Sequence, residues 1–75
     1  MDVMKHELYD SLVQKYKSEI LSYRTTLRVY FENLVAVGEH PTHLEDMDEL
    51  IEKAACANDK LKMLRLMYKE MYSKL

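Results

Sequence analysis

Tyrosine recurs every seven residues in the first half of the chain, at Tyr9, Tyr16, Tyr23 and Tyr30. Seven residues correspond to about two turns of an α-helix, so the four rings lie along one face. Aliphatic residues alternate with them at spacings of three and four, which is the heptad pattern of packed helices. This pattern predicts a long helix whose first seam consists of Tyr9, Val13, Tyr16, Ile20, Tyr23, Leu27, Tyr30 and Leu34.

The second half of the chain has a seam with the same spacing. Its members are Met47, Leu50, Ala54, Ala57, Leu61, Leu64, Tyr68 and Met71. The single glycine, Gly38, and the single proline, Pro41, lie between the seams, where they are expected to end one helix and prevent its continuation. Thr42 and Glu45 have the capping-box spacing that begins a helix. We therefore expect a helix at about 3–37, a turn at about 38–42 and a helix at about 43–75.

A chain of 75 residues has room for one domain. The two seams predict an all-α fold, in which an antiparallel hairpin of two helices packs as in a coiled coil. Folding back near residue 40 places Tyr30 near Leu50 and Tyr23 near Ala57, to within about one helical turn because the loop conformation is unknown. This register sets bulky rings against a small side chain, which fills a core without voids.

Apolar residues extend beyond both seams. A hairpin alone buries each helix along one line, whereas a stripe this wide is typical of a bundle in which each helix has two neighbours. We therefore expect two copies to form a homodimeric four-helix bundle. The flanking residues are Leu8, Leu12, Leu21, Val29, Phe31 and Val35 on the first helix, and Leu44, Ile51, Met63, Leu66, Met67 and Tyr72 on the second.

Charge is distributed unevenly along the hairpin. The segment 32–52 contains seven acidic residues and no lysine or arginine, while the rest of the chain contains eleven basic and six acidic residues. An antiparallel pair of hairpins would place the acidic turn end of one beside the basic open end of the other. Alternatively, the acidic residues only stabilise the start of the second helix through its dipole. Both interpretations are compatible with the sequence.

Few residues form a pattern that indicates chemistry. Glu39, His40 and His43 have a spacing at which two imidazoles can share a zinc ion, but a tight site needs four ligands and Cys56 lies far along the second helix. Polar turn residues and an inert thiol are the simpler interpretation. Neither seam contains a carboxylate, which argues against a carboxylate-bridged metal pair inside the bundle. We expect no enzymatic activity, no metal and no cofactor.

Packing is the expected role of most of the tyrosines, but tyrosine and methionine are also favoured where proteins recognise one another. The sequence thus predicts a protein–protein interaction module with two candidate surfaces, one near the turn and one toward the open end. The residues near the turn are Val29, Phe31 and Val35, and those toward the open end are Met4, Met63, Met67, Tyr68, Met71 and Tyr72.

A small dimeric bundle that binds nucleic acid is the alternative function. Basic residues concentrate late in the second helix, at Lys60, Lys62, Arg65, Lys69 and Lys74. The net charge is −2 and acidic residues are interleaved with the basic ones, whereas nucleic-acid-binding domains normally have a stronger basic excess. A solvated helix face explains the pattern more simply.

Three features bear on the compartment. No stretch of about 18 uncharged apolar residues is found, so we expect no membrane-spanning helix. The first residues lack the apolar core of a signal peptide. A single cysteine, Cys56, cannot form an internal disulfide, which is typical of a reducing environment. We expect a cytoplasmic protein.

The segment Val35-Ala36-Val37-Gly38-Glu39-His40-Pro41 is followed by an acidic helix start at residues 45–53. This arrangement resembles a family of small helical-hairpin proteins encoded by tailed bacteriophages, over roughly residues 34–64. The tyrosine-rich first helix departs from the family pattern. The resemblance implies a helical hairpin in a phage context, in the host cytoplasm, and assigns no activity or functional residue. It favours a protein that binds a virion component or a host protein.

Overall fold

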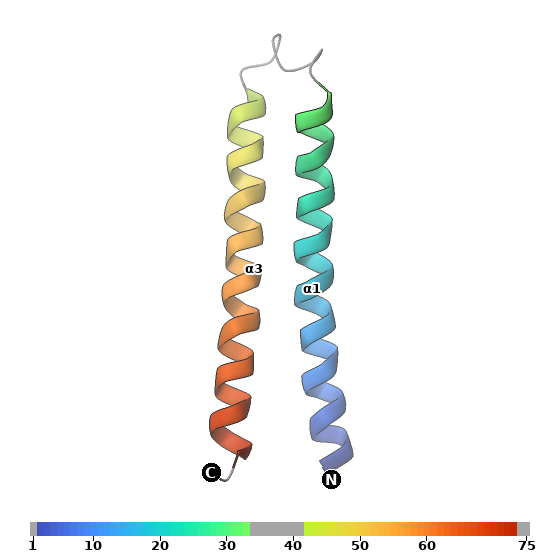
Figure 1. Cartoon of the computed structure of the whole chain (residues 1–75), viewed down its shortest axis with the longest axis vertical. Coiled ribbons are helices and arrows are strands. Elements are labelled where there is room, and N and C mark those ends of the chain that lie inside the picture. Colours follow the sequence, from blue (N-terminus) through green and yellow to red (C-terminus); the bar gives the residue numbers. More distant parts are fainter. Residues whose placement is uncertain (1, 34–41, 74–75) are drawn as a thin grey trace.

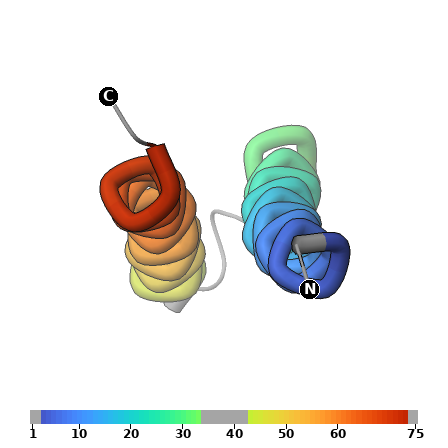
Figure 2. Tube along the Cα trace, turned by 90° about the horizontal axis from the view of Figure 1, so that it is seen from below, coloured from blue at the N-terminus to red at the C-terminus, as the bar shows by residue number. Residues whose placement is uncertain are grey.

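The computed structural model describes residues 2–33 and 42–73, and these form two helices of equal length. Helix α1 spans Asp2–Glu32 and helix α3 spans Thr42–Tyr72. The helices lie side by side and antiparallel in a rod of 56 × 18 × 14 Å (Figures 1 and 2). The described residues contain no strand. We call the end where α1 begins and α3 ends the open end, and the opposite end the tip.

The two helices contact each other along the heptad positions. Only Val13, Ala57 and Leu61 are less than 9% exposed among the described residues, at 8%, 3% and 7%. Most other heptad residues are half-buried, because two helices can cover each other along one line only. The half-buried heptad residues are Tyr9, Tyr16, Ile20, Tyr23, Leu27, Tyr30, Met47, Leu50, Ala54, Leu64 and Tyr68. Leu34 lies outside the described residues.

Helix α1 ends at Glu32, and Asn33 is not helical. The predicted helical residues 34–37 lie outside the described residues. Asparagine has a low helix propensity because its short side chain competes for backbone hydrogen bonds. The second helix begins at Thr42, at the predicted capping box, and ends at Tyr72. The predicted turn residues Gly38 and Pro41 lie outside the described residues.

The register between the helices differs from the expected one. Tyr30 lies beside His43 and Asp46 instead of Leu50, which is a shift of about one helical turn. Tyr9 lies beside Tyr68 at the other end, so the same shift applies along the hairpin. A shift of this size lies within the tolerance of the predicted register, because the connection between the helices was unknown.

Met71 was expected in the core, but it is 62% exposed. Its neighbour Tyr68 occupies the space between the helices at this level, where its ring lies against Tyr9. The Met71 side chain therefore remains at the edge of the helix contact.

At the tip, Tyr30 of α1 contacts His43 and Asp46 of α3. The Tyr30 hydroxyl donates a hydrogen bond of 3.3 Å to Asp46 Oδ2, and its ring meets the His43 ring edge-on, with 5.3 Å between centroids. Partial desolvation, followed by the charge of Asp46 and this hydrogen bond, raises the pKa of Tyr30 above its ordinary value. Sequence patterning did not predict His43 here, although it lies seven residues before Leu50.

We expect Leu61→Ala to lower the free energy of unfolding by about 2–5 kcal/mol, because it leaves a cavity beside the only buried residues of the described chain. Leu66→Ala is the matched control, since Leu66 lies on the same helix and is 50% exposed. Its effect should stay within about 1 kcal/mol. Urea unfolding followed by circular dichroism measures both values, and equal losses would contradict the described core.

The pKa of Tyr30 gives a second prediction. Because this pKa is raised in the folded state, the neutral hydroxyl contributes stability below the ordinary tyrosine pKa, and this contribution is lost as pH rises through the raised value. Tyrosinate formation is followed by ultraviolet absorbance as the pH rises, in the natural protein and in Tyr30→Phe. The difference between the two titration curves should show a group that ionises above pH 10.0. A difference curve centred at or below that value would contradict the contact with Asp46.

Candidate protein-binding groove

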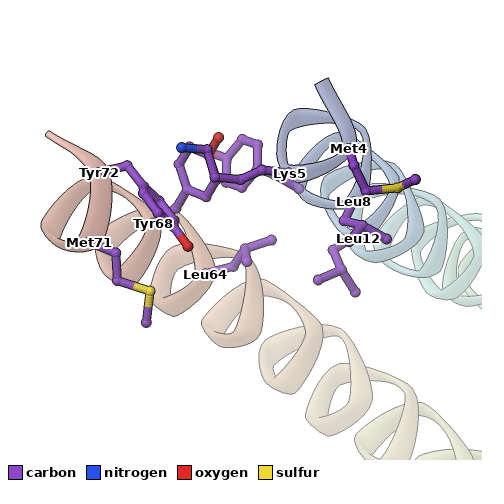
Figure 3. Close-up of a pocket in the computed structure, with 9 residues that line it drawn as sticks. Met4, Lys5, Leu8, Leu12, Leu64, Tyr68, Met71 and Tyr72 are labelled. Atoms are coloured by element: carbon purple, nitrogen blue, oxygen red, sulfur yellow. The ribbon is translucent and has the colours of Figure 1, made fainter. Parts of the chain in front are cut away.

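An apolar groove of about 500 Å³ lies between the helices at the open end. Side chains from both helices line it (Figure 3), and among the described residues no further helix covers this part of the rod. Its lining residues, which define the open-end groove, are Met4, Lys5, Leu8, Tyr9 and Leu12 from α1 and Leu64, Tyr68, Met71 and Tyr72 from α3.

Three tyrosine rings in tilted contact line the groove where the helices meet. The Tyr9 and Tyr68 centroids are 4.1 Å apart, and those of Tyr68 and Tyr72 are 5.0 Å apart. Tyr68 Oη also shares a 2.8 Å hydrogen bond with His6 Nδ1, which holds the ring in place. Aromatic pairs have preferred arrangements, and these contacts favour one orientation of the Tyr68 ring in the groove wall. His6 was not predicted, although it lies one heptad before Val13.

A lysine gives the groove a positive border. Lys5 Nζ lies 3.8 Å from the centroid of the Tyr72 ring, in cation–π geometry (Figure 3). This contact joins the two helices across the groove. Sequence patterning did not identify Lys5, because the contact depends on the register between α1 and α3 rather than on spacing within one helix.

Methionine side chains supply the adaptable part of the surface. Met4 and Met71 line the groove, and Met63 and Met67 are exposed on α3 one to two turns before Met71. Methionine has three rotatable bonds and a polarisable sulfur, so it can fit apolar side chains of different shapes. Of the predicted open-end surface, Met4, Tyr68, Met71 and Tyr72 line the groove, whereas Met63 and Met67 do not.

The predicted surface near the turn is not assembled in the same way. Val29 lines a cavity of about 300 Å³ with Thr26, Tyr30 and His43, whereas Phe31 is exposed and does not line it. Val35, the third predicted member, lies outside the described residues. The open-end groove is therefore the larger and more apolar site.

The predicted nucleic-acid contacts are spread along α3. Lys60, Lys62, Arg65 and Lys69 are all exposed, and none of them lines the open-end groove. Lys62, Arg65 and Lys69 follow each other at spacings of three and four and so share one face of the helix, whereas Lys60 lies on another side. Asp59 and Glu70 flank the group in the sequence. Lys74 lies outside the described residues.

Residues 2–33 and 42–73 bring no three histidine, cysteine or acidic side chains into metal-binding range. The single thiol, Cys56, is exposed. His40, half of the predicted histidine pair, lies outside the described residues. Neither α1 nor α3 contains an apolar stretch that would let it span a lipid bilayer.

Comparisons with protein-family models, with curated proteins and with solved structures found no match.

The tyrosine rings in tilted contact give a prediction for the groove wall. In a double-mutant cycle, Tyr9→Leu and Tyr68→Leu should show a coupling free energy of about 0.5–1.5 kcal/mol. The two effects are coupled because either substitution alone already removes the contact between the two rings. Tyr9→Leu and Tyr30→Leu, at opposite ends of the rod, should be additive to within about 0.5 kcal/mol. Urea denaturation measures both cycles. Additivity of the Tyr9 and Tyr68 substitutions would show that the rings do not support each other.

Proposed function

We propose that this chain functions by binding other proteins, without catalysis, and that its first partner is a second copy with which it forms a four-helix bundle. One observation carries the proposal. Fourteen large hydrophobic side chains among the described residues are at least 38% exposed, while only Val13, Ala57 and Leu61 are buried. An apolar surface of this extent is typical of an interaction site.

The energetic reason is the cost of leaving these side chains in water. Full burial of a leucine, methionine or phenylalanine is worth roughly 1.5–3 kcal/mol. The hairpin cannot cover its own flanks, because each helix has one neighbour. The broad face of the rod measures 56 by 18 Å. A face of this size has room for the about 800 Å² of surface that one partner contributes to a standard interface.

The open-end groove supports binding of a further protein. Its aromatic wall, its methionines and its lysine border suit an apolar segment with an adjacent negative charge. The likeness of residues 35–41 to a turn found in phage hairpin proteins supports a phage setting. In that setting the chain is an accessory or structural protein of the host cytoplasm that acts by occupying a surface of a virion component or host protein.

Sedimentation equilibrium of the purified protein tests the dimer. We expect a mass twice the 9.0 kDa of the chain at micromolar concentration. The unfolding temperature should also rise with protein concentration, because dissociation accompanies unfolding. A folded species with the mass of one chain and a concentration-independent unfolding temperature would refute the proposal.

The same samples separate protein binding from nucleic-acid binding. Fluorescence anisotropy with a labelled random DNA duplex and a structured RNA should show no binding at about 50 mM salt. Micromolar binding that weakens as salt rises would favour the nucleic-acid alternative instead.

A further inference from the structure

The hairpin has two broad faces, and cavities at the level of Leu50 distinguish them. On one side, Arg24, Ile51, Ala55 and Asn58 line a cavity of about 370 Å³. On the other side, a second cavity that also reaches Leu50 is lined by charged residues of α3 instead. We call the first side the Arg24 face.

Heptad spacing extends the Arg24 face along α1. Steps of seven residues from Arg24 lead to Asp10 toward the open end, and the adjacent line contains Glu7 and Arg28. All four side chains are exposed. On this face, α1 is therefore acidic near the open end and basic nearer the tip.

Helix α3 has the reverse polarity on the same face. Steps of seven from Ala55 lead to Asp48 toward the tip and to Lys62 and Lys69 toward the open end, and all three are exposed. Each helix is therefore complementary in charge to a copy of itself that runs in the opposite direction.

We infer that two copies stack through their Arg24 faces, turned end for end, so that α1 packs on α1 and α3 packs on α3. This inference rests on the proposed dimer and specifies its geometry. Asp10 then meets Arg24 of the second copy, and Glu7 meets Arg28. On α3, Asp48 meets Lys69 of the second copy.

The hairpin register allows one two-fold axis to satisfy both helices. The α1 pairs are symmetric about Lys17, and the α3 pair is symmetric about a point beside Asn58. Because Tyr9 is opposite Tyr68 and Tyr30 is opposite Asp46, Lys17 and Asn58 lie at nearly the same height. The difference is one to two residues, or roughly 1.5–3 Å of helix rise.

Apolar side chains add to the match. Val3 at the open end faces Phe31 of the second copy, and both are exposed in the single hairpin. Lys17 meets its own copy at the axis, where its long stem allows the ammonium group to turn toward solvent.

Long-range charge selects this orientation over a dimer with both tips at the same end. The described tip residues between Glu32 and Glu52 are rich in acidic side chains and contain no lysine or arginine. Two adjacent tips would repel each other, whereas the end-for-end arrangement sets each tip beside the basic half of the other copy.

Crosslinking with a short bifunctional thiol reagent tests the axis. The protein with Asn58→Cys in a Cys56→Ser background should form a covalent dimer, because a residue at a two-fold axis meets its own copy. The natural protein is the matched control, since its single thiol at Cys56 is exposed but lies two residues away, off the Arg24 face. Cys56 should give no covalent dimer.

A second pair of variants tests the same contact face without thiol chemistry, through the mass of the protein in solution. Ile51→Glu, on the Arg24 face, should convert the dimer to monomer in sedimentation, whereas Met67→Glu should not. The two side chains have similar exposure, 52% and 45%.

The two hypotheses fail in different ways. A dimer that is crosslinked through Cys56 but not through position 58, or that survives Ile51→Glu and is lost in Met67→Glu, overturns this geometry and leaves the proposed dimer standing. A natural protein that sediments as a folded monomer overturns both.

Discussion

Two helices can share only one line of contact, and the rest of this structure follows from that limit. The line buries Val13, Ala57 and Leu61 and half-buries the rings and aliphatic side chains on either side. It leaves apolar flanks on both faces of the rod uncovered. The hairpin therefore leaves many of its apolar side chains unburied, as one half of a four-helix bundle would. The proposed function follows from this incomplete burial.

The two faces have different chemical characters, which suits them to different partners. The Arg24 face combines apolar side chains with charges arranged symmetrically about the middle of the rod, as a contact between identical copies requires. The open-end groove is apolar and methionine-rich, with Lys5 at its border.

Sequence spacing predicts the features that depend on one helix at a time. The heptad repeat of Tyr9, Tyr16, Tyr23 and Tyr30 indicates an α-helix and the side of it that faces the partner helix, because both follow from the helical period. The register is a property of two helices and their connection, so spacing could predict it only to within about one helical turn, and the observed shift is of that size. The contacts of His6 with Tyr68 and of Lys5 with Tyr72 depend on that register, and spacing alone could not reveal them.

Small-angle X-ray scattering of the natural protein tests the central claim most directly, because it reports mass and shape together. The account predicts twice the 9.0 kDa chain mass and a maximum dimension close to the 56 Å length of one hairpin, since stacking through a face thickens the rod without lengthening it. A particle with the mass of one chain, or a dimer much longer than one hairpin, would contradict it.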